Sequence, residues 1–218
     1  MRISSKQPFR KRIDRYVRGT VLLDVLPRLS DYGLVLDVGC GDTPYTDLFV
    51  NLQYIGVDLN KRSKVAVLCD AAQLPFNSEI FDLVLASELL EHVSKPSLVL
   101  KEAYRVLRFD GHMVMTTRFL FPYHPEPTDY YRFTEEALTQ LFEEADFRIV
   151  GLEREGGLLL LLANIFSSYG GGAPHPIKEI TQLVASTLDL ADHYLKIGSE
   201  YSLGFYVHAI KQHKPNIE

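Results

Sequence analysis

Short, almost uniformly apolar segments alternate with segments of helical pattern through most of this 218-residue chain. The apolar segments are too short for core helices, and they lack the apolar–polar alternation of strands that face water on one side. They are typical of strands in a parallel sheet that is covered on both faces. The expected strands are residues 34–38, 54–57, 65–69, 81–86, 112–117, 147–152 and 203–210.

Helices separate these strands. One is expected to begin at Pro96, since proline is tolerated in a first turn, and to stop by Gly111. Thr134 is expected to cap another helix. Residues 155–200 are mostly helical by pattern. We therefore predict an α/β fold: a Rossmann-like, seven-stranded, mostly parallel sheet with helices on both faces and a helical insertion between strands six and seven.

The domain organisation follows from length and pattern. Residues 1–218 are expected to form a single domain, because this length suits one sizeable α/β unit. Residues 1–30 are expected to form a helical cap. Residues 1–18 carry seven basic side chains, and apolar positions recur at helical spacing from Phe9 to Thr20, which predicts an amphipathic helix against the domain. Its basic side chains either face solvent or form a lid over an anionic ligand.

Composition narrows the classes of function. A net charge of −5 argues against a dedicated nucleic-acid binder. The two cysteines, Cys40 and Cys69, cannot form a disulfide framework and are expected to be buried, reduced thiols, which favours a cytoplasmic location. No membrane span is expected, since no apolar run approaches the ~20 residues that a span needs.

Glycine or aspartate residues stand at the carboxyl end of each of the first three expected strands. Gly39 and Gly41 follow the first strand, Asp58 ends the second, and Asp70 ends the third. The carboxyl ends of such strands meet at one edge of the sheet, where ligands bind in doubly wound folds. The glycines let the backbone approach a ligand closely. Asp58 can accept both hydroxyls of a ribose, and Asp70, with the N–H of Ala71, can bind an adenine edge. The pattern predicts a nucleotide-like cofactor.

Five longer runs resemble, in the same order and spacing, the motifs of class I S-adenosyl-L-methionine-dependent methyltransferases of the type 11 branch. The runs are VLDVGCGDTPY, YIGVDLN, CDAAQLPF, FDLVLASELLEHV and LKEAYRVLRFDGHMVMTT, which together cover about residues 34–152. The later run HPEPTDYYRFT resembles a bacterial and archaeal subgroup whose members often lie near glycan- or lipid-modifying genes. The resemblance implies methyl transfer from S-adenosyl-L-methionine by in-line displacement, with S-adenosyl-L-homocysteine as the product.

The resemblance also implies cofactor-binding roles at the ends of the first four strands. The positions implied at the methionine and sulfonium end are Asp37, Gly39, Cys40, Gly41, Ala86 and Ser87. The positions implied at the ribose and adenine end are Asp58, Leu59, Asp70 and Ala71. The positions implied in the floor under the reactive methyl are Glu88, Glu91 and His92. Many relatives carry a third glycine where this chain has Thr43, and the following Pro44 suggests a stiffer loop.

A long aromatic loop, residues 119–133, follows the fifth strand and is expected to contact the acceptor. The expected substrate-binding residues are Tyr123, His124, Tyr130, Tyr131 and Arg132. His124 and Asp129 are the candidate catalytic bases if the acceptor must lose a proton. For Tyr131 and Phe133 the alternative role is to anchor the loop to the core. The expected acceptors are small-molecule, glycan or lipid-linked compounds.

The insertion leaves several roles open. Residues 158–166 are apolar on nearly every side of a helix. Such a helix is buried, forms an interface between two copies of the chain, or lines an apolar substrate site. A homodimer through residues 155–200 is therefore one expected assembly.

Two other functions compete with methyl transfer. A nicotinamide-dependent oxidoreductase would need a third glycine at the position of Pro44, and the chain has no Tyr-x-x-x-Lys pair. A protein of the same fold that binds the cofactor without catalysis stays open. No metal site is expected, because neither His92 nor His124 has a second ligand at metal-binding spacing.

Overall fold

The computed structural model describes residues 8–29, 33–42, 45–60, 66–125, 127–170, 172–195 and 197–212. The strands are β1 (Leu34–Val38), β2 (Gln53–Asp58), β3 (Val67–Leu68), β4 (Phe81–Ser87), β5 (Leu107–Arg118), β6 (Phe147–Arg154) and β7 (Gly204–Lys211). The helices are α1 (Pro8–Thr20), α2 (Pro96–Val106), α3 (Glu135–Glu144), α4 (Leu158–Gly170) and α5 (Ile177–Leu195). Shorter helical turns are η1 (Val21–Val25), η2 (Leu26–Arg28), η3 (Thr46–Phe49), η4 (Leu90–His92) and η5 (Ser199–Tyr201).

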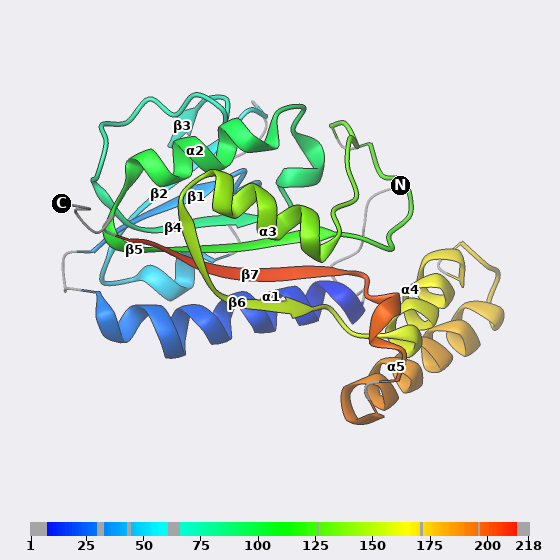
Figure 1. The fold of residues 1–218 in the computed structure, drawn as a ribbon. Helices are drawn as coiled ribbons and strands as arrows, with labels where there is room; N and C mark the ends of the chain where they lie inside the picture. Colours follow the sequence, from blue (N-terminus) through cyan, green and yellow to red (C-terminus); the bar gives the residue numbers. More distant parts are fainter. Residues whose placement is uncertain are drawn as a thin grey trace.

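The strands form one seven-stranded sheet in the order β3-β2-β1-β4-β5-β7-β6. Neighbouring strands from β3 to β5 are parallel, and β7 runs antiparallel to both β5 and β6. Figure 1 shows α2 and α3 on one face of the sheet and α1 on the other, with α4 and α5 between β6 and β7 in the chain. The predicted Rossmann-like, mostly parallel fold with its helical insertion is therefore confirmed.

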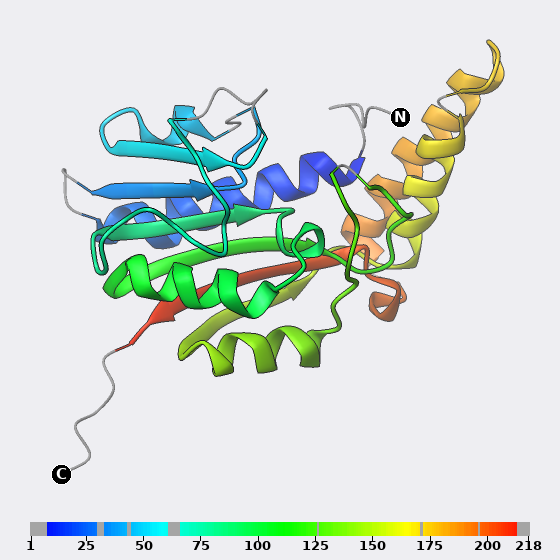
Figure 2. The ribbon, with the colours of Figure 1, turned by 90° about the horizontal axis from the view of Figure 1, so that it is seen from above.

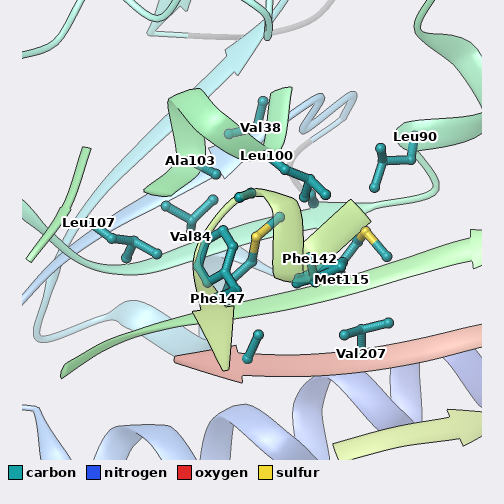
Figure 3. Close-up of a cluster of buried hydrophobic side chains, with 14 of the residues drawn as sticks. Val38, Val84, Leu90, Leu100, Ala103, Leu107, Met115, Phe142, Phe147 and Val207 are labelled. Atoms are coloured by element: carbon teal, nitrogen blue, oxygen red, sulfur yellow. The ribbon is translucent and has the colours of Figure 1, made fainter. Parts of the chain in front are cut away.

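The strands are apolar on both sides because helices cover both faces of the sheet. Successive side chains of a strand point to opposite faces. Val84 and Ala86 of β4 join the cluster under α2 and α3, whereas Leu83 and Leu85 join the cluster under α1 and η1. Figure 3 shows part of the first cluster, including Leu100, Phe142, Phe147 and Val207. Since both faces are covered, neither set of positions can be polar.

Several predicted boundaries are wrong, and for three of them strand pairing gives the reason. Strand β3 is shorter than residues 65–69, because it is an edge strand and only Val67 and Leu68 pair with β2; residues 61–65 lie outside the described residues. Strand β5 begins at Leu107 rather than at residue 112, since Leu107 already pairs with Phe81. For the same reason α2 ends at Val106 and does not extend to Gly111.

The N-terminal helix packs as its spacing predicts, but one basic side chain has another role. Ile13 and Val17 are buried against the sheet. Arg12 neither faces solvent nor forms a lid over a ligand, because its guanidinium forms ion pairs of 2.7 Å with both Asp189 and Asp192 of α5. Side chains before Arg12 lie outside the described part of the chain. Arg12 therefore joins the N-terminal helix to the insertion.

The insertion forms an antiparallel helical arm that projects beyond the sheet (Figure 2). Of the three roles considered for the apolar helix, burial applies to only one side of α4. Leu160 and Ala163 are buried, whereas Phe166 is 40% exposed and Tyr169 is 77% exposed. None of the helices in the described residues is long and apolar enough to cross a membrane.

A histidine pair is buried between β5 and β7. His112 and His208 are almost fully buried, and the Nδ1 of His112 lies 2.9 Å from the Nε2 of His208. Burial lowers the pKa of His112 to about 4, helped by His208 and Arg28 and opposed by Asp110 and Asp24. The neutral pair, in which one ring donates to the other, is therefore the form that the fold stabilises.

We expect this pair to make the fold sensitive to acid. Below the ordinary histidine pKa of 6.5 the unfolded chain binds a proton that the folded chain does not, so the free energy of unfolding falls as the pH falls toward 4. Urea unfolding should show that the wild-type protein loses about 2 kcal/mol more than the His112→Gln variant between pH 7 and pH 5. The same substitution at exposed His193 serves as the control. Equal losses in wild type and His112→Gln would contradict this account.

Candidate functional site

The turn after β1 needs glycine at two positions. Gly39 (φ 70°) and Gly41 (φ 51°) are in the left-handed region, which disfavours other residues. A Cβ added at Gly39 would lie 2.8 Å from the Cδ1 of Leu89, whereas a Cβ at Gly41 would meet no heavy atom within 4 Å. The backbone at Gly41 therefore borders open space that a ligand can approach. Thr43 and Pro44 lie outside the described residues.

Main-chain hydrogen bonds fix this turn to the end of β2. The N–H groups of Gly39 and Cys40 donate to the carbonyl of Val57, at 2.8 and 3.1 Å. The N–H of Gly41 donates to the Oδ2 of Asp58, at 2.9 Å. The ends of the two neighbouring strands are thus joined, and the Asp58 carboxylate lies directly beside the glycine turn, as the strand-end pattern predicts.

Asp37 lies beneath the turn and is 2% exposed. Its Oδ2 accepts a hydrogen bond of 2.6 Å from the hydroxyl of Tyr54. Burial raises the pKa of Asp37 to about 7; the nearby Asp58 adds to this rise, and the Tyr54 bond opposes it. A positive charge close to Asp37 would favour its ionised form.

Asp70 lies two residues beyond β3 rather than at its last residue, which corrects the predicted boundary. Its Oδ1 accepts from the N–H of Ala72 at 2.9 Å, closing a turn. The N–H of Cys69 donates to the carbonyl of Asp58 at 3.1 Å, so this turn starts beside the end of β2. Leu59, next to Asp58, is 68% exposed although it is apolar.

A buried charge cluster lies at the ends of β4, β5 and β6. Arg118 is 1% exposed and forms ion pairs with Glu88 and, at 2.8 Å, with Glu155. Its guanidinium carbon also lies 4.7 Å from the ring centroid of Phe121. Burial raises the pKa of Glu155 to about 7, with Arg118 opposing the rise. One guanidinium therefore holds two strand ends and the start of the following loop.

The chain turns sharply after β4. Glu88 has a φ of 56°, a left-handed conformation that is unfavourable for a residue other than glycine. The N–H of Glu88 donates to the carbonyl of Thr116 at 3.0 Å, and its Oε1 accepts from the Thr116 hydroxyl at 3.0 Å. The same hydroxyl lies 3.2 Å from the Oγ of Ser87. These bonds hold a strained residue at an edge where function is expected.

Arg132 and Asp129 stabilise the loop after β5 from within. The guanidinium of Arg132 donates to both carboxylate oxygens of Asp129 and also to the carbonyls of Phe121, Pro122 and Tyr131. These contacts hold the pKa of Asp129 down, at about 2. So weak a base is a poor proton acceptor near neutral pH. The structure therefore favours a positioning role for this pair over a base and a substrate clamp.

The aromatic residues of the loop divide into two groups. Phe133 is buried in the core, and the Tyr131 hydroxyl donates to the carbonyl of Ser94 at 3.1 Å, so both anchor the loop. Tyr123 is 76% exposed and Tyr130 is 51% exposed. Tyr123 and Tyr130 keep more accessible surface for an acceptor than Tyr131, which is 39% exposed.

The fold brings His92 and His124 together although they are distant in the chain. Their rings meet edge to face with centroids 4.8 Å apart. Glu91 is fully buried and accepts from the Thr117 hydroxyl at 2.8 Å. Burial and the neighbouring Glu88 raise the pKa of Glu91 to about 8. Burial also lowers the pKa of His124, which favours its neutral form.

Arg118 and Glu155 are site residues that sequence reasoning misses. The one signal in the sequence is Arg118, a charged residue directly after the apolar run that forms β5. A charge in that position is expected to be buried and to need a partner. The partner, Glu155, cannot be found from spacing, because it belongs to the end of another strand.

The family comparison agrees with the part of the fold that carries the glycine turn and the acids. Residues 36–115 match a family model described as a methyltransferase domain. The match runs from β1 through most of β5 and so includes the ends of β1 to β4.

Curated relatives match only part of this chain, and the chain matches only part of each relative. A tRNA (carboxymethyluridine(34)-5-O)-methyltransferase of Xenopus tropicalis is 32% identical over 99 residues, which are 40% of this chain and 16% of that protein. The chain spans less than half the length of the first curated relatives that it matches.

Two crystal structures match over nearly the whole chain. A SAM-dependent methyltransferase from Archaeoglobus fulgidus has a TM-score of 0.57 at 20% identity, covering 90% of this chain and 94% of that one. The [4+2]-cyclase SpnF has a TM-score of 0.64 at 19% identity, covering 97% and 85%. At these identities the structures establish the fold, and the cyclase shows that the fold alone does not fix the reaction.

We expect the Arg118 cluster to be a large contributor to stability. Arg118→Met should lower the free energy of unfolding by about 3–5 kcal/mol, because it leaves the buried Glu155 and the partly buried Glu88 without their counter-charge. Removing Glu155 as well, in Arg118→Met/Glu155→Gln, should restore part of the loss. The half-exposed pair of Arg108 with Asp82 (3.0 Å) is the control, and Arg108→Met should cost less than about 1 kcal/mol in urea unfolding. Equal losses for the two single arginine variants would contradict the assignment.

Proposed function

We propose that this chain, a class I S-adenosyl-L-methionine-dependent methyltransferase of the type 11 branch, transfers a methyl group to an acceptor held by residues 119–133. The observation that carries the proposal is the glycine turn joined to Asp58, within a segment that matches a methyltransferase domain. When bound, S-adenosyl-L-methionine supplies an activated methyl on a sulfonium. The task of the protein is then to bind, to orient and to exclude water.

The ribose and adenine end of the cofactor fits the ends of β2 and β3. Each oxygen of Asp58 accepts one main-chain N–H, which leaves further lone pairs for the two ribose hydroxyls. The exposed Leu59 side chain offers an apolar surface to an adenine face. Asp70 keeps one carboxylate oxygen outside its turn, which can accept the adenine amino group, with the N–H of Ala71 as the second contact.

The methionine end fits the space beside the glycine turn. The amino group of this end is cationic, and a cation near buried Asp37 would compensate the cost of its ionised carboxylate. Gly39, Cys40 and Gly41 supply the backbone around it, and the open space at Gly41 admits a ligand. Ser87 and His92, at and just after the end of β4, complete the proposed cofactor set.

On the acceptor side we assign Tyr123 and Tyr130 to direct contact, because both are exposed. Asp129 and Arg132 hold the loop in shape around them. His124 is the proposed catalytic residue that faces the acceptor. Its Nδ1 lies 3.1 Å from the carbonyl of Pro122, which directs its Nε2 away from the loop backbone.

Small-molecule, glycan and lipid-linked compounds are the acceptor classes that we favour. The net charge of −5 is unfavourable for a polyanionic substrate such as a nucleic acid. Several apolar side chains of the α4–α5 arm are exposed, and Figures 1 and 2 show the arm at the same end of the sheet as the loop after β5. We also propose a cytoplasmic location, since Cys40 and Cys69 are free thiols.

Calorimetric titration with S-adenosyl-L-homocysteine tests the cofactor site. The wild-type chain should bind it, and Asp58→Ala should weaken binding by roughly 10- to 100-fold, because two hydrogen bonds from ribose to a carboxylate are lost. Asp110→Asn removes an acidic charge near the amino end of β5, away from the glycine turn, and should leave the affinity unchanged. Failure of the wild-type chain to bind either form of the cofactor would overturn the proposed function.

Transfer itself is tested with methyl-labelled S-adenosyl-L-methionine and a panel of glycan, lipid-linked and small-molecule acceptors. Label should move to one acceptor class, and His124→Ala should lower the turnover while leaving the cofactor affinity intact. Cofactor binding without transfer to any acceptor would instead favour a binding protein of the same fold.

Exposed apolar side chains on the α4–α5 arm support the proposal that the chain forms a homodimer. Leu183, Leu190 and Tyr194 of α5 are at least 60% exposed, although each is large and apolar. Exposed apolar side chains gathered on one element are typical of an interface.

We expect the purified chain to have a solution mass of about twice 24.8 kDa by light scattering. Leu183→Glu should shift it to the monomer mass, since it would bury a charge in the interface. Val50, which is 81% exposed directly after η3 and outside the arm, provides the control Val50→Glu, which should stay dimeric. A monomeric wild-type chain would rule the dimer out.

A further inference from the structure

Three side chains with metal-ligating atoms converge beside the acceptor loop. Glu91 and His92 belong to η4, just after β4, and His124 belongs to the loop after β5. One ligand atom from each lies within 4.8 Å of the other two. The sequence pattern predicts no metal site here, because the two histidines are far apart in the chain, and only the fold brings them together.

Backbone carbonyls orient both histidine rings. The Nδ1 of His92 lies 2.5 Å from the carbonyl oxygen of Thr128, and the Nδ1 of His124 lies 3.1 Å from that of Pro122. A carbonyl oxygen can only accept, so each of these bonds needs the proton on Nδ1 and leaves a lone pair on Nε2. The donor-only guanidinium of Arg132 also lies 3.4 Å from the Nδ1 of His124, but the carbonyl of Pro122 is closer and the Oδ2 of Asp129, at 3.4 Å, is a second acceptor there. Within the described residues, no hydrogen bond is made to either Nε2. Metal-binding histidines are usually held in this way by a partner on the other nitrogen.

Glu91 supplies an independent sign of a missing ligand. Its side chain is fully buried, and its Oε2 accepts from the hydroxyl of Thr117. Its Oε1 is buried as well, yet no donor reaches it among the residues that the structure describes. A buried carboxylate oxygen without a partner is costly, so a group that satisfies it stabilises the fold. A ligand atom of the same carboxyl group lies within 4.8 Å of ligand atoms of His92 and His124, so one bound group can reach all three side chains.

We propose that Glu91, His92 and His124 bind one divalent transition-metal ion through a carboxylate oxygen and two imidazole nitrogens. Imidazole donors select zinc, iron, cobalt or nickel over magnesium and calcium, which prefer oxygen. Three protein ligands leave at least one position of the ion open. Both histidines are only half-buried, so that position is reachable from solvent.

The open position gives the ion a use in the proposed reaction. An ion held by His124 would face the acceptor loop, where it can bind an acceptor oxygen or nitrogen and lower its pKa. In that case His124 is a metal ligand and not a free base, and His92 binds the ion and not the cofactor. This use rests on the proposed function, whereas binding of the ion does not.

Titration of the full chain tests the proposal, after the protein has been freed of metal with a chelator and dialysed. Calorimetry with Zn²⁺ should give one bound ion per chain, and Co²⁺ should give visible absorption bands of a low-coordinate site. His124→Asn and His92→Asn should each weaken Zn²⁺ binding by at least ~10-fold and remove the bands. Glu91→Gln should do the same, and the histidine variants keep the test valid if this buried substitution impairs folding.

A second histidine–glutamate pair provides the matched control. His175 and Glu179 form an exposed ion pair of 2.7 Å on the helical arm. His175→Asn should leave both the affinity and the cobalt bands unchanged. Binding that is lost with His175→Asn and kept with His124→Asn, or no binding by the wild-type chain, would overturn the proposal.

The same samples separate this proposal from the proposed function. Titration with S-adenosyl-L-homocysteine is carried out with and without Zn²⁺. Cofactor binding without Zn²⁺ binding overturns the metal site alone. Zn²⁺ binding without cofactor binding supports the metal site and overturns the proposed function alone.

Discussion

Arg118 places a full positive charge in the interior, at the point where strands from different parts of the chain end together. Such a charge is tolerated only where acidic partners compensate it, and here Glu88 and Glu155 do so. Glu88 in turn binds Thr116, and Phe121 packs on the guanidinium. The geometry of this edge of the sheet therefore depends on one buried guanidinium.

The fold could be predicted from the sequence because its signal is local. Strands that are covered on both faces are apolar at nearly every position, with Asp37 as the exception in β1, so β1 could be recognised to the residue. The weaker predictions concern positions where pairing decides the boundary. Strand β3 pairs over two residues at the sheet edge, and Leu107 joins β5 because Phe81 lies beside it. Neither contact has a periodicity that a sequence displays.

The contacts of the candidate site likewise fall into those that the sequence order predicts and those that only the finished fold creates. The glycine turn and Asp58 come from strand ends in sequence order, so their proximity follows from the parallel sheet itself. The Arg118–Glu155 pair and the meeting of His92 with His124 depend on loops and strands that approach only in the finished fold. Arg132 is predicted to bind the substrate because arginine often does so. Its guanidinium instead forms hydrogen bonds within its own loop, which residue type alone does not reveal.

The position of β7 has a consequence for how the sheet is assembled. β7 follows the other described strands in the chain, yet it lies between β5 and β6, and within the described residues β6 pairs with the sheet through β7 alone. During synthesis, β1, β2, β4 and β5 can pair as they leave the ribosome, whereas β6 must wait unpaired while the whole α4–α5 arm is made. An exposed strand of this kind is prone to aggregation. Residues 147–154 can therefore join the sheet only after β7 has been made.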